Sequence, residues 1–116
     1  MIPDRIKRIN EACREALGEI LQEEIKDPRI GFVTVTRVEI TQDLQHGKVW
    51  VSVLGNEEEV EEAVAGLEKA KGFLRRELGR RVRMRYTPQL SIHLDHGAEV
   101  SEQVQMILKE LEEKET

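Results

Sequence analysis

Residues 68 to 86 read EKAKGFLRRELGRRVRMRY, and this stretch combines a helical pattern with the densest positive charge in the chain. From Lys69 to Arg85 there are eight basic residues and one acidic residue, Glu77, so this window carries a net charge of +7. The whole chain carries −5, so the remaining residues together carry −12. A strongly basic segment in an otherwise acidic protein indicates a surface that binds a polyanion.

The apolar residues in and just before this stretch recur at intervals of three and four. They share one face of an idealised helix: Leu67, Ala70, Leu74 and Leu78. The opposite face carries Lys69, Gly72, Arg76 and Arg80. Because Gly72 has no Cβ, the helix can bend there or another backbone can approach closely. We therefore predict a break between Ala70 and Gly72 and a phosphate-binding surface on the outer side. The alternative is an ordinary solvated face, on which Gly72 only lowers helix stability by about 1 kcal/mol.

Length and composition limit the class of protein. A chain of 116 residues fits one domain, residues 1–116, with one hydrophobic core. It has no apolar run of the roughly 20 residues that a membrane helix needs, and Met1 is followed by a charged segment instead of a signal peptide. We therefore expect a cytoplasmic protein that does not associate with membranes. Cys13 is the single cysteine, so no internal disulfide forms, and we interpret it as a core residue.

The first half of the chain predicts a helix and a hairpin. Helical spacing extends from Pro3 to Lys26, and the helix is expected to end at Asp27, because Pro28 disfavours a helical residue before it. Residues 30–41 are rich in β-branched side chains and predict a strand, and the apolar parity changes near Thr36 and Arg37, which predicts a bulge there. After a turn over residues 43–47, the alternating segment KVWVSVL predicts an antiparallel partner strand. Trp50 falls on its less buried face, where packing against a neighbouring element is favoured over a stacking role.

The second half predicts a helix, a break, a second helix and a strand. Asn56 is suited to cap a helix that begins with several glutamates. The helical piece after the break ends at Gly79, which suits a left-handed C-cap. A third strand is predicted where apolar residues alternate with arginines, at Val82, Met84 and Tyr86. Pro88 interrupts this strand, and the alternation resumes at Leu90. Residues 99–116 predict a C-terminal amphipathic helix with a frayed acidic end.

The order helix, strand, strand, helix, break, helix, strand is that of a type II KH-like domain of the α+β class. Several short motifs are spread over nearly the whole chain: Asp27-Pro28-Arg29, the TVTRVEITQDL stretch ending at Leu44, Ala70-Lys71-Gly72, Leu74-Arg75, and Pro88 with Leu90 and Asp95. In their order and spacing they resemble the ribosome-binding factor A family. In that family an A-x-G kink stands where other KH domains carry a phosphate-clamping G-x-x-G loop, and Ala70 and Gly72 match it.

The resemblance implies RNA recognition without catalysis. Family members bind the immature small (30S) ribosomal subunit, assist 16S rRNA processing and subunit maturation, and leave with the help of a GTPase in some bacteria. A monomer with no cofactor is expected. The predicted RNA-binding residues are those of the basic window: Lys69, Ala70, Lys71, Gly72, Arg75, Arg76, Arg80, Arg81, Arg83 and Arg85. The basic first half of the first helix offers a secondary candidate set, for which an ordinary solvated face is the favoured interpretation: Arg5, Lys7 and Arg8.

Enzymatic and metal-binding interpretations have little support. The chain has no Walker-type phosphate loop, no paired cysteine motif and no serine nucleophile with a histidine signature. His93, Asp95 and His96 offer too few ligands for a structural metal site, so turn or surface roles are favoured. The alternative function is a protein-interaction adaptor whose arginines serve stability. Internal ion pairing of the arginines favours the adaptor, and an exposed patch without carboxylate partners favours RNA binding.

Overall fold

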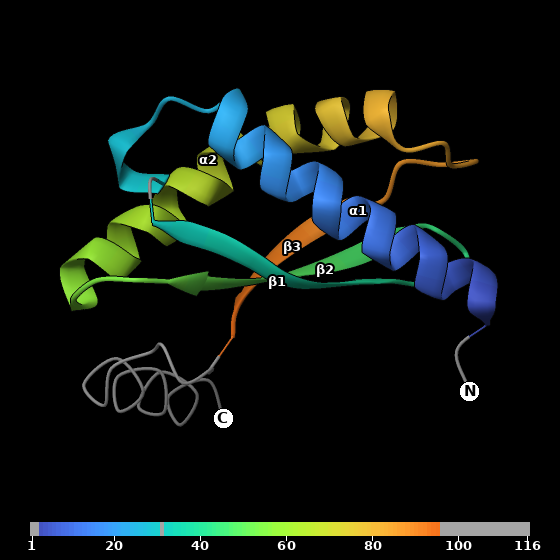
Figure 1. Ribbon diagram of the computed structural model, residues 1–116, viewed down its shortest axis with the longest axis horizontal. Helices are drawn as coiled ribbons and strands as arrows, with labels where there is room; N and C mark the ends of the chain where they lie inside the picture. Colours follow the sequence, from blue (N-terminus) through green and yellow to red (C-terminus); the bar gives the residue numbers. More distant parts are fainter. Residues whose placement is uncertain (1–2, 31, 96–116) are drawn as a thin grey trace.

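The computed structural model describes residues 3–30 and 32–95. Its elements in chain order are α1 (Asp4–Glu23), η1 (Pro28–Ile30), β1 (Val33–Ile40), β2 (His46–Val53), α2 (Glu57–Arg81) and β3 (Gln89–Leu94) (Figure 1). This order confirms the predicted α+β class. The helix predicted over residues 99–116 lies outside the described residues.

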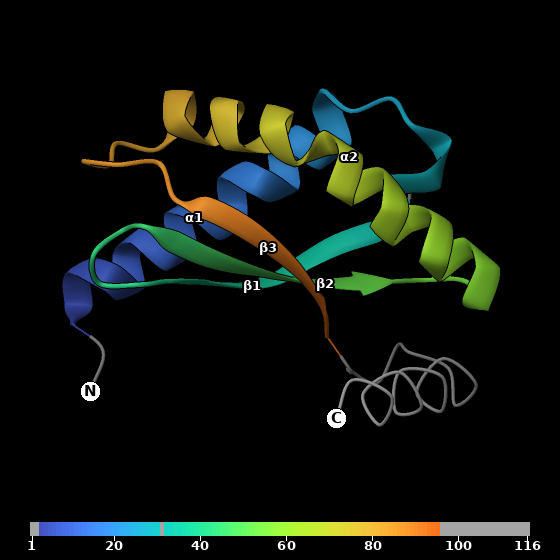
Figure 2. The ribbon, with the colours of Figure 1, turned by 180° about the vertical axis from the view of Figure 1, so that it is seen from behind.

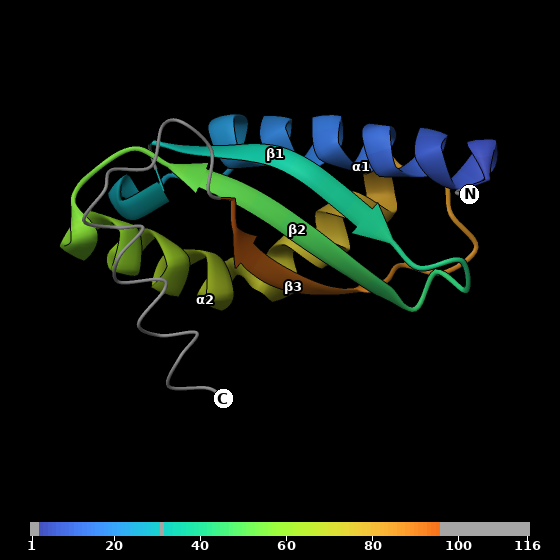
Figure 3. The same ribbon diagram turned by 90° about the horizontal axis from the view of Figure 1, so that it is seen from below.

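The three strands form one sheet in the order β1-β2-β3. β1 and β2 are antiparallel, whereas β2 and β3 are parallel and are joined by α2. Figures 1 and 2 show α1 and α2 on the same face of the sheet, and Figure 3 views the sheet from its other face. The fold is therefore two layers, with the core between the helices and the sheet.

The predicted bulge is confirmed. The pairing of β1 with β2 shifts register between Val35 and Arg37, so that Thr36 has no partner residue. Val33 and Val35 are buried before the shift, and Val38 and Ile40 are buried after it. The extra residue therefore keeps both halves of β1 facing the core despite their opposite parity in the sequence.

The ends of α1 and β1 differ from the prediction. α1 ends at Glu23 instead of Asp27, because Glu24 and Ile25 both donate their N–H groups to the Ile20 carbonyl and the chain then leaves the helix. Pro28–Ile30 forms a 3-10 turn closed by a 3.0 Å bond from the Ile30 N–H to the Asp27 carbonyl. β1 consequently begins at Val33 and not at Ile30.

α2 begins as predicted and continues further than predicted. The Asn56 side chain accepts from the Glu59 N–H at 2.8 Å, and Glu59 completes the capping box. The helix then runs unbroken to Arg81, so the predicted interruption at Ala70 to Gly72 is wrong. Figures 2 and 3 show instead that the axis changes direction between the green first half and the yellow second half. Buried leucines on both sides, Leu67 and Leu74, hold the two halves on the core and outweigh the small helical cost of Gly72.

The third strand begins later than predicted. Residues 82–88 are irregular, and β3 starts at Gln89. The parallel register pairs Gln89 with His46, the first residue of β2, so the residues before Gln89 lie beyond the start of β2 and have no strand to pair with. Val82 and Met84 are still partly buried against the core, but Tyr86 is exposed. The alternation predicted for this segment therefore fails at Tyr86.

Trp50 packs on the sheet face opposite the helices, which confirms the favoured interpretation. The Arg37 guanidinium carbon lies 4.7 Å from the centroid of the Trp50 ring, and the His93 ring centroid lies 4.9 Å from it. The Asp95 carboxylate accepts the Thr36 hydroxyl at 2.7 Å, and the Asp95 N–H donates to the Val51 carbonyl at 2.8 Å. Asp95 therefore fastens the end of β3 to the bulge. His96 lies outside the described residues.

Candidate nucleic-acid interface

A hollow of about 700 Å³ lies between the second half of α2 and the irregular segment 82–88. We call it the Gly72 groove. Its lining consists of Gln45, Gly72, Arg75, Arg76, Gly79, Arg85, Tyr86 and Thr87. A Cβ added at Gly72 would meet nothing within 4 Å, so the helix backbone is open to a ligand at this point. The groove therefore offers an accessible main chain between cationic side chains.

Gly79 allows the two walls of the groove to approach each other. A Cβ added there would lie 2.7 Å from the Thr87 hydroxyl oxygen. The predicted left-handed C-cap at Gly79 is wrong, because the helix continues to Arg81 and the extended residue Val82 is its C-cap. The requirement for glycine at this position comes from close packing of a distant segment and not from a left-handed backbone.

Arg75 fastens the outer wall to α2. Its Nε donates to the Pro88 carbonyl at 3.2 Å and its Nη2 to the Thr87 carbonyl at 3.0 Å. Two of the three guanidinium nitrogens are thus used within the protein. Arg75, predicted as an RNA contact, therefore has a positioning role in the groove, and the N–H groups left for a ligand are the two on Nη1 and the second on Nη2.

The hairpin turn brings Gln45 to the groove. The Asp43 carboxylate accepts the Thr41 hydroxyl at 2.6 Å and the Gln45 N–H at 3.0 Å, and the hydroxyl, followed by the N–H, lowers the pKa of Asp43. The Gln45 carbonyl accepts the Gln89 N–H at 2.9 Å, which ties the turn to the start of β3. No signal in the sequence near residues 68–86 could have identified Gln45, because its position depends on the pairing of β2 with β3.

The structure divides the predicted RNA-binding residues according to their partners. Within residues 3–30 and 32–95, no carboxylate pairs with Lys69, Arg76, Arg83 or Arg85. Lys71 pairs with Glu68 at 2.8 Å, and Arg80 pairs with Glu77 at 3.4 Å on the exposed face of α2. Ala70 is partly buried against the core, so only its backbone could contact a ligand.

Arg81 and Arg83 lie away from the Gly72 groove. They line a second hollow of about 600 Å³ beside α1, which also contains Arg8. Arg81 forms ion pairs with Glu19 and Glu24 there and joins the two helices. The basic window that is continuous in sequence is therefore split between two surfaces, and Arg8 of the predicted secondary set belongs to the second of them.

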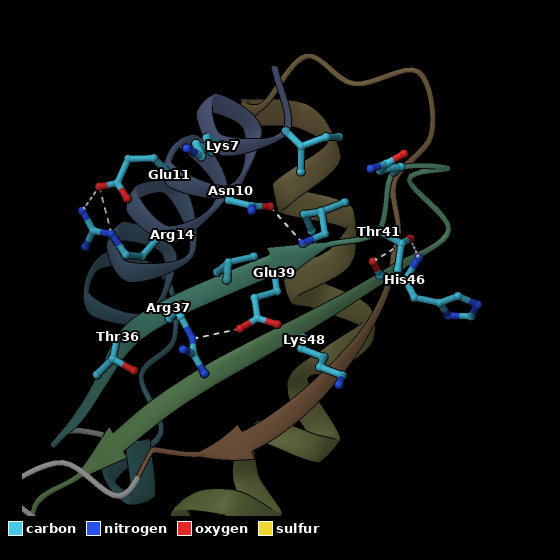
Figure 4. A pocket seen from close by; sticks show the side chains of 14 residues that line it. Lys7, Asn10, Glu11, Arg14, Thr36, Arg37, Glu39, Thr41, His46 and Lys48 are labelled. Atoms are coloured by element: carbon cyan, nitrogen blue, oxygen red, sulfur yellow. Dashed lines mark hydrogen bonds and ion pairs between the residues drawn. The ribbon is translucent and has the colours of Figure 1, made fainter. Parts of the chain in front are cut away.

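A third hollow, of about 710 Å³, lies between α1 and the edge strand β1 (Figure 4). It contains Lys7 of the secondary set, whereas Arg5 lines neither this hollow nor the other two. Its charges are mixed, because Arg14 pairs with Glu11 and Arg37 with Glu39.

The Asn10 side chain accepts the outward Ile40 N–H at 2.8 Å, and this bond together with the bulge protects the strand edge from pairing with another chain.

Cys13 is fully buried, with its sulfur 3.9 Å from the Met84 sulfur. Burial raises the pKa of the Cys13 thiol to about 11 from its ordinary value of 9.0. The folded protein therefore keeps a proton that the unfolded chain loses above pH 9. A catalytic or redox role for this thiol is disfavoured by the same shift.

We expect the free energy of unfolding to decrease as the pH rises from about 9 to 11. Deprotonation of Cys13 in the unfolded chain should account for about 2 kcal/mol of this decrease. Urea denaturation at pH 8, 9, 10 and 11 would measure it. Other groups titrate in this range, so the Cys13→Ala variant is the control, and it should show a smaller decrease. An equal decrease in both proteins would contradict this assignment.

Comparison with known proteins identifies the family. The model of the ribosome-binding factor A family matches residues 5–108 of the chain. The chain belongs to this family. Ribosome-binding factor A of Staphylococcus carnosus is 43% identical over 110 residues, which cover 95% of this chain and 96% of that relative. The resemblance found in the short sequence motifs is thus confirmed.

Solved structures of ribosome-binding factor A share the fold. The crystal structure of the Thermus thermophilus protein has a TM-score of 0.70 and 31% identity, covering 77% of this chain and 94% of that one. A homology model of the Thermus thermophilus protein, fitted into a cryo-electron microscopy map of its complex with 30S, has a TM-score of 0.62 and 32% identity. It covers 91% of that chain and 75% of this one.

The described residues, 3–30 and 32–95, contain no membrane-spanning helix and no cluster of metal ligands. None of their helices is long and apolar enough to cross a membrane. Within the same residues, no group of three or more His, Cys, Asp or Glu side chains could hold a metal ion. The ribosome-binding factor A family is a family of ribosome-binding factors and not a known enzyme family.

Proposed function

We propose that this chain binds the immature small ribosomal subunit through 16S rRNA and assists rRNA processing and subunit maturation without catalysing a reaction. The observation that carries the proposal is the Gly72 groove, where Arg76 and Arg85 have no carboxylate partner among the described residues. Membership of the ribosome-binding factor A family and the 30S complex of the Thermus thermophilus relative support it.

The proposed contacts follow the geometry of the groove. Arg76 and Arg85 bind phosphates directly, Lys69 and Arg80 extend the cationic side of α2, and the backbone at Gly72 admits a phosphate between them. Arginine forms paired hydrogen bonds to phosphate oxygens, and each neutralised phosphate releases counterions. Arg8, Arg81 and Arg83 form a separate and weaker contact, since Arg81 is already paired with glutamates.

The arrangement of charge favours RNA binding over the adaptor alternative. An adaptor that uses its arginines for stability would pair most of them internally, whereas Lys69, Arg76, Arg83 and Arg85 face no carboxylate in the described chain. The rest of the chain is acidic and would repel RNA elsewhere. The proposal further includes a cytoplasmic monomer that an assembly GTPase helps to release.

Cosedimentation with purified small and large ribosomal subunits across a salt series would test the function. We expect preferential binding to small subunits, with log affinity decreasing against log salt by about 0.7 to 0.9 for each phosphate neutralised. Three or four contacts would therefore give a slope of about −2 to −4. Equal binding to both subunits, or an affinity that does not change with salt, would contradict the proposal.

A further inference from the structure

Tyr86, the single tyrosine of the chain, is an exposed aromatic residue in the Gly72 groove. Its side chain is 49% exposed, and among the described residues it shares such exposure only with two other large hydrophobic side chains, Phe32 and Leu54. Unlike those two, it lies among arginines. An accessible ring beside cations is the combination with which proteins bind unpaired nucleotides.

The backbone that carries Tyr86 is anchored although it has no regular structure. Arg75 donates to the carbonyls of the next two residues, Thr87 and Pro88, and Pro88 is fully buried. Thr87 packs directly against the backbone of Gly79. The ring is therefore exposed on a rigid support, so little conformational entropy would be lost when a ligand packs on it.

Charged and open positions surround the ring. The Arg85 guanidinium carbon lies 5.5 Å from the Tyr86 ring centroid. Arg76 and the open backbone position at Gly72 belong to the facing helix of the same groove. A nucleotide whose base packs on the ring would thus have cationic groups within reach of its phosphates.

We propose that Tyr86 stacks on an unpaired nucleobase, and that the Gly72 groove therefore selects single-stranded RNA over duplex RNA. In a duplex each base is already stacked and paired, so its face cannot reach the ring. This inference rests on the proposed RNA-binding function and specifies the form of RNA that the same site takes. It also assigns distinct tasks, since Arg76 and Arg85 contact phosphates and Tyr86 contacts a base.

The test uses the full chain and a fluorescein-labelled eight-nucleotide RNA, presented as a single strand, as a blunt duplex, and as single strands with one abasic position each. Fluorescence anisotropy would give the dissociation constants. Stacking of one base contributes about 1–3 kcal/mol, which corresponds to roughly 5- to 150-fold in affinity. We expect Tyr86→Leu to weaken single-strand binding about tenfold without weakening duplex binding, and Tyr86→Phe to bind within about threefold of the original protein.

The abasic strands distinguish stacking from a general loss of the site. One abasic position should weaken binding to the original protein about tenfold and have little further effect on Tyr86→Leu. The salt slope of Tyr86→Leu should be unchanged, whereas Arg76→Gln should lower its magnitude by about one. Unchanged single-strand affinity in Tyr86→Leu, equal losses for single strand and duplex, or a Tyr86→Phe variant as weak as Tyr86→Leu would each overturn the inference.

Failure of the inference and failure of the proposed function give different results. If stacking is wrong but the function is right, Tyr86→Leu still prefers small subunits as the original protein does. If the function is wrong, the original protein shows no preference for small subunits, whatever its affinity for short RNA. The subunit assay and the oligonucleotide assay therefore report on the two proposals separately.

Discussion

Replacing Arg76 and Arg85 together with glutamate is expected to lower the affinity for small subunits by at least 100-fold at low salt. Both side chains line the Gly72 groove and have no carboxylate partner in residues 3–30 and 32–95. A hydrogen bond to a charged group contributes about 1.5–3 kcal/mol, so the loss of two arginine–phosphate contacts corresponds to about 100-fold or more. Cosedimentation of the variant with small subunits would measure it, and the salt slope should fall in magnitude by about two.

The matched control carries the same change of charge at a distance from the groove. Lys26→Glu with Lys48→Glu alters two exposed lysines, neither of which lines the Gly72 groove. If long-range attraction governs binding, the control should lose as much affinity as the groove variant; if the groove is the contact, it should lose far less. Similar losses in the two variants would therefore contradict the site. Circular dichroism of both variants would verify that the fold is retained.

Truncation of Leu78 is expected to lower the free energy of unfolding by about 2–5 kcal/mol. Leu78 is 0% exposed and belongs to the core between α2 and the sheet, one residue before the close contact of Gly79 with Thr87. The Leu78→Ala variant removes buried methyl groups and leaves a cavity that the surrounding helices and strands can fill only partly. Because domains of this size are stable by about 5–15 kcal/mol, the variant should show a clearly lower midpoint in urea denaturation.

Leu54→Ala provides the comparison for this measurement. Leu54 is the same residue type at 61% exposure, so its truncation should change the free energy of unfolding by no more than about 0.5 kcal/mol. The midpoints of the two variants should differ while their denaturant slopes stay similar. Equal effects at positions 78 and 54 would mean that the second half of α2 is not packed as described.

The arginines of the basic window differ in whether they already have partners within the protein. Arg81 is held between Glu19 and Glu24, and Arg75 is bound to two backbone carbonyls, so both stabilise the tertiary structure. Arg76 and Arg85 have no such bonds among the described residues, although Arg85 lies over the Tyr86 ring. Arginines of one short segment thus divide into those that stabilise the tertiary structure and those to which the proposal assigns RNA contacts.

Features with a local cause were predictable from the sequence. The leucine face of α2, the cap at Asn56, the antiparallel hairpin and the bulge at Thr36 follow from residue spacing and from the conformational preferences of neighbouring residues. The outward face with Lys69, Gly72, Arg76 and Arg80 was predicted for the same reason, since helical periodicity places it opposite the buried leucines.

Features that depend on distant partners were not predictable. The close approach of Thr87 explains Gly79 better than a helix cap does, and the register with His46 delays the third strand to Gln89. Exposure of Tyr86, its place beside Gly72 and the diversion of Arg81 toward α1 all result from packing between segments far apart in the chain. Local interactions specify helices, strands and their faces, whereas long-range packing selects which side chains meet, and the Gly72 groove is a product of that packing.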